Sequence, residues 1–316
     1  MNYKEIQKER QIIVLEEHPE YFDDDKAGGY FRKIARPFVL RDGRNNLYAP
    51  IREAVVGYFK ENHISWWGGS RPTGHLLSSQ VACLNHLFAL RHDKDAVLAL
   101  VNNLRPGLSF DDVLPLRNDK HPQYVSFEAV SNYDHLNEDP PTRGTNCTSI
   151  DAIIAAKTTL GETWLIPIEW KYTESYYRQD KSKETGRGAI RIGRYSGLID
   201  SSRYLKTMVD YISTPYFFEP FYQLMRQTLW TEQMIVHKEE EWIRADRFLH
   251  VHVVPRDNKE LLLKKYHFSG KGMEESWRDL LQEDVYQLIS PETFLSPLEG
   301  NPDYRDLFIY LQTRYW

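Results

Sequence analysis

The 316-residue sequence lacks the features that mark several common classes of protein. It has two cysteines, Cys83 and Cys147, and neither belongs to a Cys-x-x-Cys pair. This argues against a cysteine zinc site and against a disulfide-stapled secreted domain. No apolar run approaches the ~20 residues needed to cross a membrane, and the N-terminal segment is too charged for a signal peptide. We therefore expect a cytoplasmic protein without a membrane segment.

An excess of positive charge is also missing, because 40 Lys and Arg stand against 45 Asp and Glu, a net charge of −5. A protein that coats nucleic acid would be basic overall, so any contact with nucleic acid must come from a local basic patch. The sequence contains no Walker loop, no Gly-x-Ser-x-Gly elbow and no His-Glu-x-x-His motif. The candidate chemistry must therefore be sought elsewhere.

Hydrophobic residues make up 41% of the chain, enough for one large core. Residues 124–130, 148–158 and 163–174 are β-branched, aromatic or alternating, and predict three strands. The short turn around Gly161 predicts that the second and third strands form an antiparallel hairpin. Residues 247–254 predict a fourth strand. Helices are predicted over residues 1–17, 50–62, 76–91, 94–104, 203–212, 219–235, 273–289 and 301–316.

This order of elements predicts an α/β fold with a mixed sheet flanked by helices and with helical additions at both ends. We divide the chain into an N-terminal helical and loop extension (1–75), a core (76–260) and C-terminal helices (261–316). The three parts are expected to pack as one compact unit.

The third predicted strand carries charged residues in an apolar setting. Because side chains alternate faces along a strand, Glu169 and Lys171 share the face opposite Ile168 and Trp170. The hairpin partner contributes Asp151 from an otherwise apolar strand. A carboxylate buried there without a partner would cost several kcal/mol, and a metal ion would serve as that partner.

Two carboxylates can hold Mg²⁺ while water and phosphate oxygens complete its coordination shell, and the Trp170 carbonyl is a further candidate ligand. The ion would lower the pKa of a bound water and neutralise developing charge. Lys171 beside it can orient the water or stabilise the phosphate. Asp151, Glu169 and Lys171 are therefore the candidate catalytic residues for phosphodiester hydrolysis, with Mn²⁺ as a substitute ion.

An Asp on one strand, a short turn and Glu-x-Lys on the next resemble the PD-(D/E)xK nuclease superfamily, which includes restriction endonucleases. The resemblance covers about residues 76–255 and implies a restriction-endonuclease-like core of helix, three-strand antiparallel meander, helix and strand. It implies a weaker metal ligand at Glu128, and polar groups that approach the site from the helix after the third strand. Those candidates are Gln223 and either Arg226 or Gln227. Pro167 departs from the pattern, because it cannot donate a hydrogen bond within a central strand.

A basic segment, residues 178–194, follows the motif strand and predicts contact with a phosphate backbone, although a solvated loop would look the same. Its cations, set against Asp180 and Glu184, are Arg178, Lys181, Lys183, Arg187, Arg191 and Arg194. The tryptophans of the loop over residues 66–74 either stack on bases or pack against the core.

The leading hypothesis is a metal-dependent endonuclease acting on nucleic acid, most simply DNA, in restriction, defence or repair. Cutting of both strands would favour a homodimer. One alternative is a protein of the same fold that binds nucleic acid without cutting it. Another is an unrelated metalloenzyme that uses His250 and His252, which share one face of the fourth strand.

Overall fold

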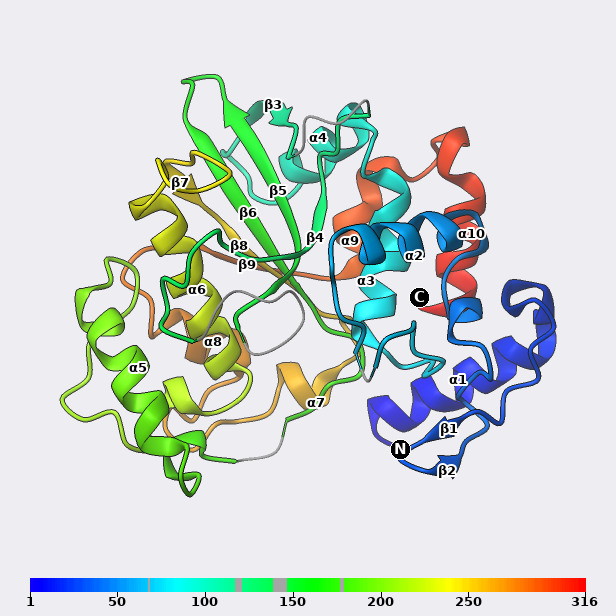
Figure 1. Ribbon diagram of the computed structural model, residues 1–316, viewed down its shortest axis with the longest axis horizontal. Helices are drawn as coiled ribbons and strands as arrows, with labels where there is room; N and C mark the ends of the chain where they lie inside the picture. Colours follow the sequence, from blue (N-terminus) through cyan, green and yellow to red (C-terminus); the bar gives the residue numbers. More distant parts are fainter. Residues whose placement is uncertain (68, 117–120, 139–146, 177–178) are drawn as a thin grey trace.

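The computed structural model describes residues 1–67, 69–116, 121–138, 147–176 and 179–316. In these residues a seven-stranded mixed sheet lies between two helical layers (Figure 1). The helices are α1 (Tyr3–Glu17), α2 (Arg52–Glu61), α3 (Ser79–Leu87), α4 (Lys94–Asn102), α5 (Gly188–Ser201), α6 (Phe221–Val236), α7 (Lys259–Leu262), α8 (Met273–Arg278), α9 (Pro291–Leu295) and α10 (Arg305–Arg314). The strands are β1 (Tyr30–Phe31), β2 (Ile34–Ala35), β3 (Phe110–Leu114), β4 (Ser126–Ala129), β5 (Ile150–Thr158), β6 (Thr163–Trp170), β7 (Arg247–Phe248), β8 (His250–Val253) and β9 (Tyr286–Ile289).

The sheet runs in the order β3-β5-β6-β8-β9, with β4 also paired to β5 and β7 to β6. Strands β3, β4 and β6 pair antiparallel with β5, whereas β7 and β8 pair parallel with β6, and β9 pairs parallel with β8. The predicted hairpin of the second and third strands is confirmed, with Ala152 opposite Ile168 and Lys157 opposite Thr163. Its turn places Gly161 at φ 84°, a conformation that favours glycine.

Strand β5 is apolar along most of its length because both of its faces are covered. Ala152 and Ile154 pack in a core with α2, α3, α4, α9 and α10, whereas Ile153 and Ala155 pack in a second core with α5, α6 and α8. Figure 1 shows these two sets of helices on opposite sides of the sheet. We name the two sides the α3 face and the α6 face.

Pro167 is accommodated by a break in the neighbouring strand. Strand β6 pairs with β7 at Leu165 and with β8 from Ile168 onward, in the same register. Leu249 separates β7 from β8, so the predicted fourth strand is divided near the level of Pro167. The missing N–H of the proline therefore leaves no gap in a continuous ladder.

Two predicted helices are wrong. Residues 203–212 are irregular, and the helix in this region is α5, which covers part of the segment expected to be a loop. Leu205 bridges to Leu281, and Lys206 N donates to Leu280 O at 2.9 Å. Leu280 and Leu281, which make these contacts, lie just after α8. The predicted helix over 273–289 therefore ends there, and the structure has α8 and then β9 in its place. Tertiary partners have overridden local helical spacing in both segments.

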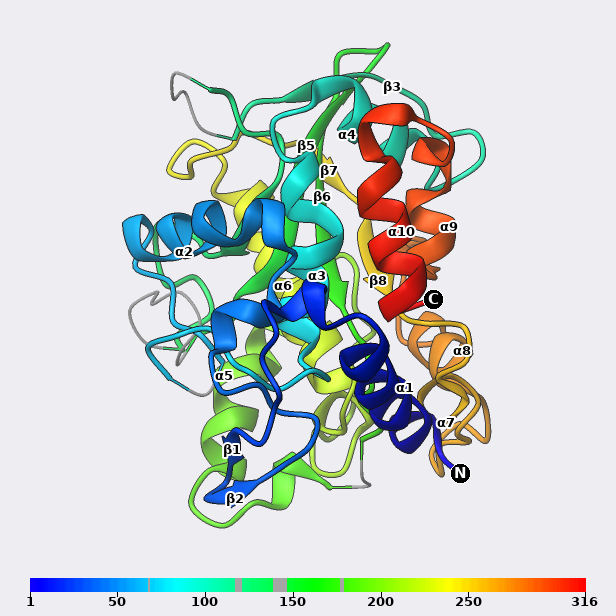
Figure 2. The same cartoon turned by 90° about the vertical axis from the view of Figure 1, so that its right-hand side faces the viewer.

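The helices at the two ends of the chain lie side by side, as Figure 2 shows for α1 and α10. Gln11 on α1 donates to the Tyr172 hydroxyl at 2.9 Å and accepts from the guanidinium of Arg314 at 3.0 Å. Arg314 and Gln11 are both fully buried. Within the described residues, none of the helices is at once long and apolar enough to cross a bilayer.

Candidate active site

The strand register places three acidic residues in one row across the sheet. Glu128 on β4 stands opposite Asp151 on β5, between the paired positions on either side of them. Asp151 stands opposite Glu169 on β6, one step beyond the last ladder pair. We name Glu128, Asp151 and Glu169 the acid row. Glu169 also pairs with His252 on β8, so a histidine continues the row.

The surroundings of Asp151 disfavour its charged form. It is half-buried, and its Oδ2 accepts a hydrogen bond from Trp170 N at 2.8 Å. Burial raises the pKa of Asp151 well above its ordinary value, and the charges of Glu169 and Glu128 raise it further. Neither Lys171 nor the Trp170 hydrogen bond offsets these effects. The surrounding protein therefore favours the protonated form of Asp151 over the carboxylate.

Glu169 and Lys171 form a buried ion pair on the α6 face. Their exposed fractions are 1% and 5%, and Lys171 Nζ contacts Glu169 Oε1. Burial acts to lower the pKa of Lys171, but the charge of Glu169 outweighs it, so the pKa lies well above its ordinary value. Lys171 is therefore an ammonium at neutral pH, held against the Glu169 side chain.

Two glutamines of α6 hold this ion pair in place. Gln223 Oε1 accepts from Lys171 Nζ at 2.7 Å, and Gln227 Nε2 donates to Glu169 Oε2. The two glutamines are four residues apart, so they lie on the same side of the helix, one turn from each other. Gln223 and Gln227 thus lie beside the acids, on a helix that is the second after β6, because α5 comes between β6 and α6 in the chain.

Glu128 is turned toward α3. Its φ of 48° is unusual for a residue other than glycine. Its carboxylate accepts from Gln80 Nε2 on α3 at 2.6 Å and from Ser149 Oγ at 2.8 Å. Glu128 and Asp151 border a small cavity that Cys83 of α3 also lines. The acid row therefore meets the α3 face at Glu128 and the α6 face at Glu169, with Asp151 between them.

Arg226, the other candidate on this helix, has a different partner. Its Nε donates to Glu138 Oε1 at 2.8 Å, and Glu138 is 2% exposed. The Tyr195 hydroxyl donates to the same carboxylate at 2.6 Å. The structure thus brings Arg226 to a buried acid outside the acid row, and its charge has a structural role there.

The basic segment is partly neutralised by neighbouring acids. Arg191 and Arg194 lie on α5 rather than in a loop. The ion pairs of the segment are Lys181–Glu219 (2.8 Å), Lys183–Asp180 (3.8 Å), Arg187–Glu184 (3.7 Å) and Arg191–Glu184 (2.6 Å). Arg194 has no acidic partner among the residues that the structure describes. Lys183 and Arg187 are the most exposed of the paired cations, at 65% and 74% of their side chains.

The two histidines of β8 are buried and have protein partners. His250 Nε2 lies 3.1 Å from Gln227 Oε1, and His252 Nδ1 lies 2.8 Å from the Tyr286 hydroxyl. Burial lowers the pKa of His250 to about 3 and that of His252 well below its ordinary value, so both are neutral at pH 7. In the described parts of the chain, no three His, Cys, Asp or Glu side chains are grouped as a set of metal ligands.

One comparison with known proteins gives a match. The model of the family REase-ARP, described as restriction endonuclease associating with ARP, matches residues 9–316. Neither a curated protein nor a solved structure matches the chain. The family match covers nearly the whole sequence, from the middle of α1 through every strand of the sheet to α10. The chain therefore belongs to the REase-ARP family of restriction endonucleases.

Proposed function

We propose that the protein is a divalent-metal-dependent endonuclease that hydrolyses phosphodiester bonds of nucleic acid, with DNA as the substrate. The observation that carries this proposal is the juxtaposition of Asp151 and Glu169 on paired strands, with Lys171 held beside them. Membership of a restriction endonuclease family supports a nuclease, and the Asp, Glu-x-Lys arrangement supports a PD-(D/E)xK core within it.

The oxygen chemistry of the acid row suits a hard divalent cation, although its three carboxylates do not form a ready-made ligand group in the described residues. Asp151, Glu169 and the Trp170 carbonyl would supply oxygen ligands, and Glu128 would supply a further carboxylate. The raised pKa of Asp151 reflects its burial first and then repulsion from Glu169 and Glu128, and a bound cation would offset both effects. Mg²⁺ or Mn²⁺ bound there would activate a water and neutralise charge on the phosphate. Since each carboxylate oxygen has two lone pairs, the hydrogen bonds from Trp170 and Gln227 leave acceptor capacity.

Lys171 would act on the substrate through its ammonium group. Two of its three N–H donors are directed to Glu169 and Gln223. The third neighbours Tyr176 and would turn to the attacking water or to a non-bridging phosphate oxygen, where negative charge increases in the transition state. The buried partners fix the orientation of the ammonium before the substrate binds.

Gln227 would be a positioning residue, since it joins Glu169 to His250. We expect Gln227→Leu to lower kcat by about 10- to 100-fold, the usual cost of losing a group that orients a metal ligand. Gln227→Glu should not restore activity, because it places a second carboxylate against Glu169. The measurement is single-turnover cleavage over a range of Mg²⁺ concentrations, with thermal unfolding as the control for fold. Unchanged cleavage by Gln227→Leu would remove Gln227 from the site.

Metal binding should become tighter as pH rises. Because the pKa of folded Asp151 is raised, the metal-free native state keeps a proton that the unfolded chain has lost. Protonated Asp151 therefore adds to the free energy of unfolding at low pH. This contribution is lost as the pH rises through the pKa that Asp151 has in the folded protein. Above that pH a cation replaces the proton. The Mg²⁺-induced increase in Tm should grow with pH in the wild type and stay flat in Asp151→Asn; equal pH dependence in both would contradict this assignment.

A cleavage assay over a panel of substrates tests the proposed function. Purified protein should cut DNA with Mg²⁺ or Mn²⁺ and should not cut in EDTA. Binding of nucleic acid without cleavage in either ion would instead identify a catalytically inactive member of the fold. Cleavage that requires zinc and is lost in His252→Ala, but not in Asp151→Asn, would favour the histidine metalloenzyme. Double-strand cuts with second-order dependence on protein would show that two copies act together.

A further inference from the structure

The N-terminal part of the chain contains a cavity of about 1260 Å³. Residues 30–32, 39–44 and 69–74 line it, together with Val56, Lys60, Ile64, Trp66 and Trp67. We name it the N-terminal cleft. Its lining is basic in a protein of net charge −5. Asp42 is the single acidic residue among the described lining residues. The exposed cations of the cleft are Arg32, Arg41, Arg44, Lys60 and Arg71.

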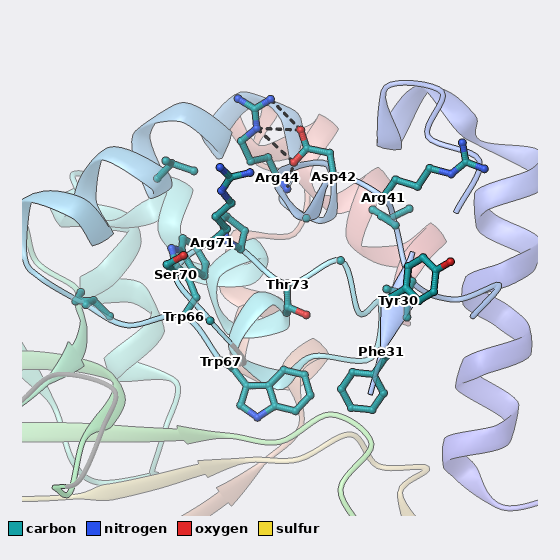
Figure 3. A pocket seen from close by; sticks show the side chains of 18 of the residues that line it. Tyr30, Phe31, Arg41, Asp42, Arg44, Trp66, Trp67, Ser70, Arg71 and Thr73 are labelled. Atoms are coloured by element: carbon teal, nitrogen blue, oxygen red, sulfur yellow. Dashed lines mark hydrogen bonds and ion pairs between the residues drawn. The ribbon is translucent and has the colours of Figure 1, made fainter. Parts of the chain in front are cut away.

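Two of these five cations already have a protein partner, and the others are available to a ligand. Arg44 is paired with Asp42 at 2.8 Å, and Arg41 Nε donates to the Ala27 carbonyl at 2.9 Å. Lys60 and Arg71 have no acidic partner within the described ranges. Figure 3 shows Arg44 and Arg71 together on one side of the cleft and Arg41 beside Tyr30. An excess of unpaired arginine around one cavity favours a polyanion, because guanidinium groups bind phosphate oxygens in pairs.

Exposed aromatic rings form another wall of the cleft. Trp67 and Phe31 are stacked with ring centroids 5.7 Å apart and an interplanar angle of 26°, and Figure 3 shows them opposite the arginines. Trp67 is 49% exposed and Tyr30 is 78% exposed. The neighbouring Trp66 packs instead on Phe59 in the core at 3.8 Å. Exposed aromatic rings beside cations are typical of surfaces that bind unpaired bases and their phosphates.

The cleft has a closely packed floor. Leu40 N donates to Gly74 O at 2.8 Å, and a side chain at Gly43 would place its Cβ 1.8 Å from the Pro72 carbonyl oxygen. The two segments that carry Arg41, Arg44 and Arg71 are therefore held against each other. A surface with this support can present its arginines without first becoming ordered on binding.

One residue connects the cleft to the acid row. Trp67 N donates to Gln80 Oε1 at 3.0 Å, and Gln80 Nε2 donates to Glu128 Oε1 at 2.6 Å. The aromatic wall is thus one side chain away from the proposed metal site. A nucleic acid strand bound in the cleft would therefore lie close to the acid row.

We infer that the N-terminal cleft binds a single-stranded segment of the nucleic acid substrate, with phosphates on its arginines and bases stacked on Trp67. The inference rests on the proposed function for the role of the acids. It places the recognition surface in residues 30–74 rather than in the basic segment 178–194. A duplex keeps its base faces stacked inside, so it would make less use of Trp67.

Binding in EDTA separates recognition from cleavage. The probe is a fluorescent 12-nucleotide mixed-sequence single strand of DNA, measured by anisotropy and compared with its duplex and with the RNA of the same sequence. Wild-type protein should bind the single strand more tightly than the duplex. Trp67→Ala should weaken binding roughly 5- to 100-fold, whereas Trp67→Phe should keep most of the affinity. Arg41→Ala with Arg71→Ala should reduce the slope of log Kd against log salt by about 1.4.

Arg305→Ala, at an exposed arginine on α10, is the matched control for loss of charge and should bind like the wild type. Equal losses in the control, unchanged binding by the cleft variants, or tighter binding of the duplex would overturn the inference. The inference would also be overturned if the double variant Arg187→Ala with Arg194→Ala lost binding while the cleft variants kept it. Tighter binding of RNA with the same dependence on Trp67 would support the cleft and assign it to RNA. Cleft-dependent binding without cleavage in Mg²⁺ would reject the proposed function and leave the cleft in place.

Discussion

Asp151→Asn should lose at least about 100-fold in Mg²⁺-dependent cleavage while the metal-free protein stays as stable as the wild type or becomes more stable. The amide keeps an oxygen that can accept from Trp170 N, which now bonds Asp151 at 2.8 Å. It removes a charge whose pKa is raised by burial and by two neighbouring carboxylates. A ligand to the cation is lost, and with it the activated water and the neutralised phosphate.

Asp151→Asn is thus expected to lose cleavage without losing stability. This combination distinguishes a metal ligand from an acid that serves only the fold. A carboxylate that served only the fold would lower Tm when replaced and would leave no specific defect in metal response. Asp111→Asn is the matched control, because Asp111 is an exposed residue of β3 outside the acid row. It should cut at the wild-type rate. Retention of wild-type cleavage by Asp151→Asn would contradict the proposed mechanism.

Lys171→Met should lower the free energy of unfolding by about 3–5 kcal/mol, because it leaves Glu169 as an unpaired charge in the interior. Glu169 is 1% exposed and its remaining contact, from Gln227, is neutral. The double variant Glu169→Gln with Lys171→Met removes both charges and should recover most of that stability. Neither variant should cut nucleic acid, since the first lacks the ammonium and the second also lacks a metal ligand.

The coupling of Glu169 to Lys171 is measured by a double-mutant cycle. Chemical unfolding is compared for the wild type, Lys171→Met, Glu169→Gln and the double variant. Lys171→Arg is the further comparison, because it keeps the charge and changes its shape. It should stay folded and lose most of its activity, since the larger guanidinium cannot occupy the ammonium position between Glu169 and Gln223 without displacing one of them. If Lys171→Met were as stable as the wild type, the ion pair would not be the buried contact that the structure shows.

The central strands were predictable because their signals are local. Alternation along residues 163–174 separates Ile168 and Trp170 from Glu169 and Lys171, and the turn at Gly161 pairs this strand with β5. These two facts were enough to bring Asp151 and Glu169 to facing positions. The partners of Lys171 on α6 were only partly predictable, because helical spacing offered Gln223, Arg226 and Gln227 without saying which would turn toward β6.

What the sequence did not reveal depends on long-range contacts. The pairing of Leu205 with Leu281 removes two expected helices, and β9 becomes recognisable as a strand only beside β8. The N-terminal cleft is assembled from several short segments between residues 30 and 74, and its cations are scattered among them. The dense basic run at 178–194 gives the stronger signal in the sequence, although acids that lie beside it in space neutralise much of its charge.

Binding of Mn²⁺ to the substrate-free protein, followed by electron paramagnetic resonance, tests most directly whether the acidic residues of β5 and β6 hold a divalent ion. The account predicts a saturable site in the wild type, weakened by Asp151→Asn and by Glu169→Gln and unchanged by Asp111→Asn. Equal Mn²⁺ binding by all four proteins, or none by the wild type with or without nucleic acid, would contradict it.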